Sequence, residues 1–346
     1  MLHFLNTRYS QSLVRNVALP GHRSVSLLAS LPAVLVPPVV FGGLLLSLWT
    51  YKCAMMVLFQ NKIIYMPGIP LGTRRETLAT YRHLCGTIDW NEHRRTLRTS
   101  DGKLLSTVTA STLPVPGNID STHILVVYFQ GNASSTPPRL PYLSAVLAAV
   151  SAGSSTRYSF LVPSYRGYWT STGRPSQRGI EKDLVALFTH LDADPDARVI
   201  LWGQSIGCGI ALTGWAKYLR SRNNHPRVNV VGLVLETPFV SVSNMLRVLY
   251  PQRWLPYRYL SPFLWNSWDV REAVETVRGM QPRVLVVRAE RDEIVPVEET
   301  EEVEGVVRSV FGDVKSVVVK GALHEQCVSR AYGRGEIVAF IKGFEK

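Results

Sequence analysis

Ser205 has the clearest capacity for chemistry, because it lies at the centre of the pentapeptide Gly203-Gln204-Ser205-Ile206-Gly207. The pentapeptide fits the G-x-S-x-G pattern, in which a serine occupies a sharp turn from a strand into a helix. An apolar run at 198–202 precedes it and a helical pattern follows it. We predict that Ser205 is a nucleophile and that Gly203 and Gly207 leave room for the backbones that cross at this elbow. The alternative is a strand-to-helix turn without catalytic function.

His324 is the candidate base, since a serine hydroxyl becomes a good nucleophile only when a base takes its proton. In the fold that carries this elbow, the chain order is serine, then an acid, then histidine. Of the eight histidines, His324 alone follows both the serine and a later apolar strand, at 316–320. The alternative is an ordinary histidine in a surface loop.

Asp292 is the candidate acid that would orient the imidazole. It follows the predicted strand 283–288, in a loop that turns before Pro296 opens the next helix. Its short side chain suits a fixed bond to imidazole. Glu290 and Glu293 lie in the same loop and remain alternatives, because enzymes of this type also use glutamate.

A tetrahedral intermediate also needs two N–H donors to form an oxyanion hole. One is expected from Ile206, the residue after the nucleophile, and the other from Asn132, in the glycine loop after the predicted strand 124–130. An asparagine in such a loop is equally compatible with plain turn formation.

Short apolar runs alternate with helical patterns along the rest of the chain, which predicts a mostly parallel sheet with helices on both faces. Together with the elbow, this alternation predicts the α/β-hydrolase fold. An Asp-Gly turn at 100–102 predicts an opening hairpin between 94–99 and 103–110. The expected buried strands are 124–130, 158–163, 198–202, 230–235, 283–288 and 316–320, and the clearest helices are 180–191, 205–219, 297–311 and 335–344.

The N-terminal region predicts a membrane anchor, because residues 33–51 are almost wholly apolar and a spanning helix needs roughly 20 such residues. We assign residues 1–60 to a basic segment and transmembrane anchor and residues 61–346 to the catalytic domain. Within that domain, the aromatic-rich residues 240–268 predict a small apolar cap or acyl-binding wall, or else ordinary core helix. A cleaved signal or an organelle transit segment is the alternative to the anchor. The expected location is the endoplasmic reticulum or mitochondrial membrane.

Charge and cysteine content exclude several other classes of protein. The formal net charge is +12, but residues 1–75 hold seven Lys or Arg and no Asp or Glu. The remainder carries 31 basic against 26 acidic residues, or +5. This distribution indicates targeting or lipid contact, and nucleic-acid binding is not expected. The four cysteines are scattered without metal-ligand spacing, so we expect no metal site and no cofactor.

Five motifs occur in order along the chain: FQNKIIYMP at 59–67, QGNASS at 130–135, SYRGYWTSTG at 164–173 with Pro175-Ser176, the elbow, and DEIVP at 292–296. Together they resemble the bud-emergence-type (BEM-like) membrane-anchored α/β hydrolases, which are similar to the ABHD-type serine hydrolases, including protein depalmitoylases. The resemblance covers about residues 58–346 and implies a single-pass anchor and the triad Ser205, Asp292 and His324. Two positions depart from the family: Gln130 stands where histidine is usual, and Trp169, expected to narrow the pocket, stands where glycine is usual.

The function expected from these residues is hydrolysis of an ester or thioester, with a fatty acyl group, through an acyl-enzyme on Ser205. The partners are then the acyl substrate and the lipid bilayer. The alternative reactions are those of a serine peptidase or a lysophospholipase, because the fold does not fix the bond that is cleaved. A catalytically silent membrane scaffold is the alternative from another class.

Overall fold

The computed structural model describes residues 32–112, 122–223 and 225–345. The described residues divide into two units, one that ends at Tyr51 and one that begins at Lys52. The basic segment expected at 1–30 lies outside the described residues.

The second unit is built on one sheet, which has eight strands in the described part of the chain, in the order β1-β2-β4-β3-β5-β6-β7-β8. β2 pairs antiparallel with β1 and β4, and all the other neighbours are parallel. The mostly parallel α/β-hydrolase sheet and its opening hairpin are thereby confirmed. The strands are β1 (Asn91–Arg98), β2 (Leu104–Ser111), β3 (His123–Phe129), β4 (Arg157–Ser164), β5 (Arg198–Gln204), β6 (Asn229–Glu236), β7 (Arg283–Ala289) and β8 (Val314–Val319).

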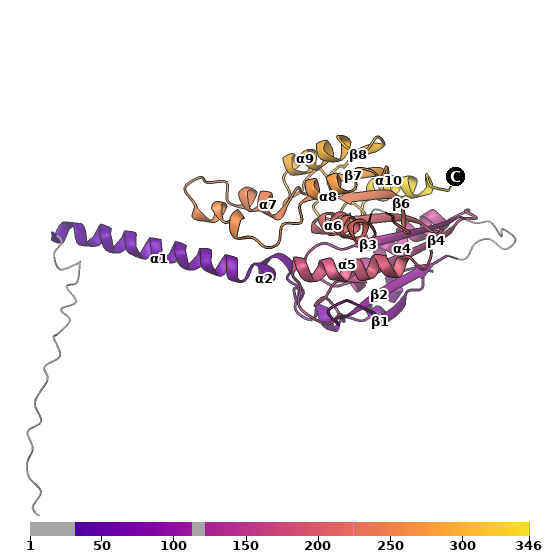
Figure 1. Cartoon of the computed structure of the whole chain (residues 1–346), viewed down its shortest axis with the longest axis horizontal. Coiled ribbons are helices and arrows are strands. Elements are labelled where there is room, and N and C mark those ends of the chain that lie inside the picture. Colours follow the sequence, from indigo (N-terminus) through magenta and orange to yellow (C-terminus); the bar gives the residue numbers. More distant parts are fainter. Residues whose placement is uncertain (1–31, 113–121, 224, 346) are drawn as a thin grey trace, which may run out of the picture. The chain divides into compact units, whose positions relative to one another are not determined.

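Helices cover both faces of this sheet (Figure 1). α4 (Leu140–Ser151) and α10 (Ala331–Lys342) bury their apolar sides in one core, together with Val126 of β3. The opposite core contains Val127, the next residue of the same strand. Its helices are α5 (Gln177–Leu191), α6 (Ile206–Ser221), α8 (Val270–Thr276) and α9 (Val297–Arg308). Successive residues of a strand point to opposite faces, so a continuous apolar run serves both cores.

Polar caps fix where several helices begin. Ser176 accepts the N–H of Gly179 at the start of α5, and Ser241 accepts the N–H of Asn244 at the start of α7 (Val242–Leu249). Each side chain satisfies a backbone donor that has no partner within the helix. The remaining short helices are α2 (Gln60–Tyr65), α3 (Leu78–Tyr81) and the 3-10 turns Thr73–Arg75, Arg82–Leu84, Pro137–Arg139, Pro256–Tyr259 and Ser261–Phe263.

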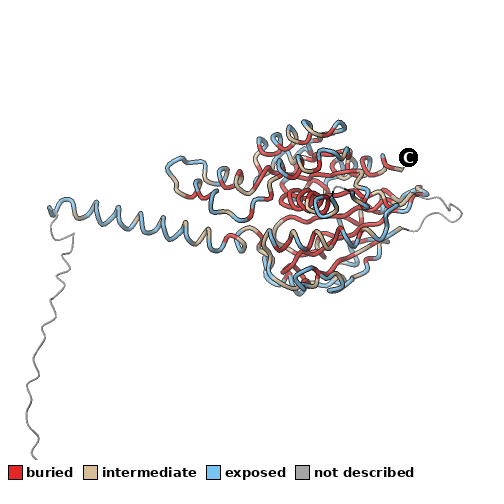
Figure 2. The backbone as a smooth tube through the Cα atoms, viewed as in Figure 1, coloured by how far each residue is buried: buried red, intermediate tan, exposed pale blue. Residues whose placement is uncertain are grey.

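α1 (Val36–Leu58) is long and apolar enough to cross a membrane. Together with the 3-10 turn Ala33–Leu35 it forms a 26-residue apolar helix. None of the most apolar stretch of this helix is buried within the protein. Figure 2 shows it largely pale blue, in contrast with the red strands. Pro37 and Pro38 lie in the first turn of α1, where a missing N–H costs little, and so they do not break the helix.

The second unit begins at Lys52, and the boundary predicted from sequence lies at 60/61. Gln60 is 2% exposed, and its side chain binds residues about 200 positions later in the chain. Its Nε2 donates to Phe263 O at 3.2 Å, and its Oε1 accepts the N–H of Trp265 at 2.9 Å and Nδ2 of Asn266 at 3.0 Å. Residues 52–60 therefore belong to the folded unit, because their polar contacts hold the 263–266 segment.

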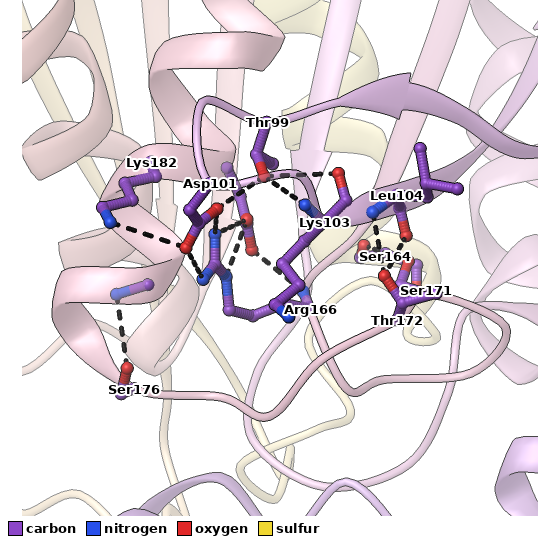
Figure 3. A network of polar contacts seen from close by, with 12 residues as sticks. Thr99, Asp101, Lys103, Leu104, Ser164, Arg166, Ser171, Thr172, Ser176 and Lys182 are labelled. Carbon is purple, nitrogen blue, oxygen red and sulfur yellow. Dashed lines mark hydrogen bonds and ion pairs between the residues drawn. The ribbon is translucent and has the colours of Figure 1, made fainter.

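Arg166 explains part of the 164–173 motif (Figure 3). Its Nη1 and Nη2 bind the Asp101 carboxylate at 2.8 and 3.1 Å, and its Nε and Nη2 bind Asp183 at 2.8 and 2.6 Å. One buried guanidinium thus joins the hairpin turn, the loop after β4 and helix α5, using the planar donor geometry that suits carboxylates. The role of this arginine is to hold the fold, since it lies outside the cavity described below.

Candidate active site

Ser205 occupies the turn between β5 and α6 with φ of 54° and ψ of −124°, a conformation that L-residues seldom adopt. Its N–H donates to Glu236 O at 2.8 Å. The flanking glycines are required by close approach: a Cβ on Gly207 would lie 2.1 Å from Phe129 O, and one on Gly203 would lie 2.5 Å from the backbone of Cys208. This is the strained elbow expected from the pentapeptide.

Asp292 and His324 are in direct contact. Nδ1 of His324 lies 2.9 Å from Oδ1 and 2.8 Å from Oδ2 of Asp292, and both side chains are largely buried. Oδ1 also accepts the N–H groups of Ile294 at 3.0 Å and Val295 at 2.8 Å. Burial acts to raise the pKa of Asp292, but the His324 hydrogen bond, its charge and the two backbone donors outweigh burial and lower the pKa below its ordinary value.

The two glutamates of the same loop bind the backbone instead of the imidazole. Oε2 of Glu293 accepts the N–H of His324 at 3.0 Å, and Oε2 of Glu290 accepts the N–H of Gly321 at 2.8 Å. Among the described residues, Asp292 is the carboxylate in hydrogen-bond contact with the His324 ring. The geometry therefore favours Asp292 as the candidate acid over both alternatives.

The three candidate triad residues follow the carboxyl ends of parallel strands at one edge of the sheet. Ser205 follows β5, Asp292 follows β7 and His324 follows β8. Ser205 lines a cavity together with Val295, whose N–H is bound by Asp292. The edge at the carboxyl ends of the strands is where open α/β sheets place their ligands.

The candidate oxyanion donors border the same cavity. Ile206 and Asn132 both line it, and neither backbone N–H has a hydrogen-bond partner within the described chain. Residues 65–69 hold the loop that carries Asn132. Ala133 N–H donates to Tyr65 O at 2.9 Å, and Ser134 N–H donates to Ile69 O at 2.6 Å. The segment that follows the apolar helix thus positions this loop.

Gln130, which stands where the family resemblance leads us to expect histidine, binds within the same loop. Its side chain is fully buried, with Nε2 donating to Ala133 O at 3.4 Å and Oε1 accepting the Thr136 hydroxyl at 3.4 Å. The backbone carbonyl of Gln130 accepts the Tyr165 hydroxyl at 3.0 Å. Both ends of the amide are therefore used to hold the loop around Asn132.

The cavity at Ser205 has a volume of about 250 Å³ and mostly apolar walls. Its lining includes residues from the end of α1 and from α2, and residues from α7 and the turns that follow it. The 240–268 segment therefore contributes part of the apolar lining of the cavity. The lining residues are Met56, Val57, Gln60, Ile63, Ile64, Asn132, Ser205, Ile206, Phe239, Val242, Met245, Leu246, Leu249, Tyr250, Leu260, Leu264, Ile294 and Val295.

Trp169 does not narrow this cavity, contrary to the expectation from sequence. Its ring is 1% exposed and packs in the core on the α4 and α10 face, and its Nε1 donates to Glu76 O at 2.8 Å. Its φ of 40° falls in the left-handed region, which glycine adopts freely. The backbone at this position thus explains a family preference for glycine, and the tryptophan fills core volume instead of pocket volume.

Glu236 is a buried carboxylate beside the site that the sequence interpretation did not include. It ends β6, is 0% exposed, and accepts Trp202 Nε1 at 3.0 Å and Val328 N–H at 3.2 Å. Burial raises its pKa to about 7, against the opposing effect of these hydrogen bonds and of Arg139 and His324. The available signal was a charged residue closing an otherwise apolar strand.

Within the described residues, no cluster of three His, Cys, Asp or Glu side chains is placed to hold a metal ion. The four cysteines, all of them in the described ranges, are free.

Known proteins of similar sequence share the hydrolase domain. Bem46 of Schizosaccharomyces pombe is 27% identical over 241 residues, which cover 69% of this chain and 71% of that protein. The α/β hydrolase domain-containing protein WAV2 of Arabidopsis thaliana is 27% identical over 268 residues, or 74% of this chain and 77% of that protein. This chain resembles the Bem46-type α/β hydrolases. No protein-family model matches the chain.

Within this group of relatives, lysophosphatidylserine lipase ABHD12 of Gallus gallus is 31% identical over 187 residues, which cover 51% of this chain and 46% of that lipase. Among solved structures, the esterase Pf2001 of Pyrococcus furiosus superposes with a TM-score of 0.53 at 18% identity, over 77% of this chain and 94% of the esterase. That likeness supports the α/β-hydrolase fold.

Proposed function

We propose that this protein is a membrane-anchored serine hydrolase that cleaves a fatty-acyl ester or thioester. The observation that carries the proposal is the apolar cavity that reaches Ser205, on the same sheet edge as the bonded Asp292–His324 pair. Esterase and lipase relatives support hydrolysis as the class of reaction. The helix Ala33–Leu58 would hold the enzyme at the bilayer.

In the proposed reaction, Ser205 Oγ attacks the acyl carbonyl and its proton passes to Nε2 of His324. Asp292 holds the imidazole by Nδ1 and stabilises the imidazolium that forms. The N–H groups of Ile206 and Asn132 donate hydrogen bonds to the oxyanion of the tetrahedral intermediate. His324 then gives the proton to the departing alcohol or thiol, and a water activated by the same histidine hydrolyses the acyl-enzyme.

The cavity supports a long acyl chain as the group that is transferred. Its walls offer aliphatic and aromatic side chains and few polar ones. Each methylene group of an acyl chain that moves from water to such a surface contributes about 0.8 kcal/mol to the free energy of binding. A relative that is a lysophosphatidylserine lipase further supports a single-chain lipid as one substrate.

The test is covalent labelling by a fluorophosphonate probe, with full-length wild-type protein and Ser205→Ala. We expect the wild type to label and the variant to lose labelling while it keeps its melting temperature within a few degrees, since one oxygen is removed. Lysophosphatidylserine and an S-palmitoyl peptide, each presented in vesicles, then distinguish an oxygen-ester lipase from a thioesterase. An unlabelled, inactive wild-type protein would instead indicate a membrane scaffold.

A further inference from the structure

The segment between β6 and α8 exposes large apolar side chains in the folded unit. Five of its residues, Leu249, Trp254, Tyr259, Phe263 and Trp265, are 44–68% exposed. They follow or end the short elements α7, Pro256–Tyr259 and Ser261–Phe263. Single exposed apolar residues are ordinary on a protein surface, but several within one short segment mark a surface that meets a partner.

The charges in this segment are all positive. Residues 240–268 contain Arg247, Arg253 and Arg258 and no Asp or Glu. None of these arginines pairs with a carboxylate within the described chain: Arg247 binds the Asn244 amide and Arg258 binds a backbone carbonyl. Elsewhere in the described chain some arginines pair with acids, as Arg271, Arg278 and Arg283 each do. Others, such as Arg74 and Arg95, bind backbone carbonyls. The partner expected for exposed aromatics among unpaired arginines is an anionic, partly apolar surface.

The segment also touches the last turns of the apolar helix and the residues after them. Nζ of Lys52 lies 4.3 Å from the Tyr257 ring centre, and Gln60 Nε2 donates to Phe263 O at 3.2 Å. Trp265 Nε1 donates to Asn61 Oδ1 at 3.2 Å. A membrane span that ends at Leu58 brings these residues to the level of the lipid headgroups.

The cavity opens onto the same surface. Leu249 lines the cavity and is also 63% exposed. A lipid at this surface therefore has a path to Ser205 that stays apolar along its walls.

We propose that residues 247–265 form a second membrane contact, which docks the cavity opening on the headgroups and outer acyl region of an anionic phospholipid bilayer. The inference rests on the membrane anchoring of the proposed function, but it does not depend on the catalytic triad. The exposed aromatic rings enter the interface, and the arginines bind lipid phosphate and carboxylate groups.

The test uses full-length protein in vesicles of phosphatidylcholine alone or mixed with phosphatidylserine. Quenching of tryptophan fluorescence by brominated phospholipid is compared for the wild type and Trp254→Phe, since their difference isolates Trp254 from the other seven tryptophans. We expect Trp254 to be quenched, and more strongly in the anionic vesicles. An unquenched Trp254 in both vesicles would overturn the proposal.

A charge-reversal pair tests the arginines. Arg247→Glu with Arg253→Glu should lower the hydrolysis of a vesicle-borne substrate about ten-fold in anionic vesicles, with little change on a short soluble ester, which also reports that the variant is folded. The control is Arg98→Glu with Arg227→Glu, two exposed arginines outside the segment. Equal losses in both pairs would overturn the proposal. The inactive Ser205→Ala protein should show the same Trp254 quenching, so failure of the proposed catalysis is read separately.

Discussion

Nδ1 of His324 lies within 2.9 Å of both carboxylate oxygens of Asp292, while Oδ1 is held in place by the N–H groups of Ile294 and Val295. An amide at position 292 would keep its oxygen on these two N–H groups and direct its N–H₂ group to Nδ1 of His324, which would favour the wrong tautomer of the imidazole. We expect Asp292→Asn to lower kcat on a soluble ester by on the order of 10³–10⁴. Steady-state kinetics of the purified protein measure this loss.

Glu290→Gln and Glu293→Gln are the matched controls, because both side chains accept backbone N–H groups of the histidine loop and leave the ring untouched. Each should cost less than about ten-fold in kcat, since a neutral amide oxygen still accepts these hydrogen bonds. A larger loss at either glutamate than at Asp292 would reassign the acid.

The raised pKa of Glu236, about 7, predicts a pH dependence of stability. The folded protein holds this proton more tightly than the unfolded chain does. Its contribution to stability is therefore fully present below pH 4.5, the ordinary pKa, and is lost as the pH rises through about 7. Relative to Glu236→Gln, the wild type should lose up to about 3 kcal/mol of unfolding free energy between acidic and mildly basic pH.

Thermal unfolding of both proteins in one detergent, across this pH range, measures the difference. A difference that stays constant with pH would show that Glu236 does not change its protonation in the folded state. The opposite slope would show that its hydrogen bonds with Trp202 and Val328 outweigh its burial.

Two truncations test where the catalytic unit begins. Removal of residues 1–51 should leave kcat/KM on a short soluble ester within about three-fold of the full-length value, because the compact unit starts at Lys52. Removal of residues 1–60 deletes Gln60 with its three hydrogen bonds to residues 263–266, and also Met56 and Val57, which line the cavity. We expect that protein to be less stable by about 2–4 kcal/mol, at roughly 1 kcal/mol for each hydrogen bond plus lost apolar burial.

Chemical denaturation of the two truncated proteins measures this difference. Gln60→Ala in the longer one should reproduce about 2 kcal/mol of the loss, since it removes the hydrogen bonds and keeps the wall. Equal stability of the two truncated proteins would place residues 52–60 outside the folded unit.

Leu246 is 8% exposed and faces the cavity, so Leu246→Trp should fill acyl-binding volume. We expect kcat/KM for long-chain esters to fall about ten-fold, the equivalent of roughly two buried methylenes, with short-chain esters little affected. A series of p-nitrophenyl esters of increasing chain length measures the effect. Leu84→Trp, at a leucine that is 55% exposed and outside the cavity, is the control. A uniform loss at all chain lengths would show overpacking of the core instead of a shortened pocket.

The elements that follow local rules were predictable from sequence. The parallel strands are continuous apolar runs, because both of their faces are covered, and the hairpin turn shows its Asp-Gly pair. The elbow requires glycine at 203 and 207, because a Cβ atom at either position would lie less than 3 Å from backbone atoms. Asp292 and His324 follow β7 and β8, neighbouring parallel strands, and so chain order was enough to bring their predicted positions together.

Features that depend on distant polar contacts were not predictable. Gln60 binds residues more than 200 positions away, and no periodicity signals such a pair. The strand order places β4 between β2 and β3, a crossover that the apolar runs do not encode. The core position of Trp169 was also not predictable, because it depends on the left-handed backbone conformation at this residue, and the sequence does not reveal that φ angle.

The wall that Met56 and Val57 contribute restricts how the apolar helix can vary. Each residue inserted into a helix rotates everything on one side of it by about 100° relative to the other side. An insertion between Lys52 and Gln60 would turn Met56 and Val57 away from the cavity or displace Gln60 from Asn266. For the proposed membrane anchor, adjustment to bilayers of different thickness is therefore expected before residue 52. Helical turns added or lost there do not rotate Met56 and Val57 relative to the cavity.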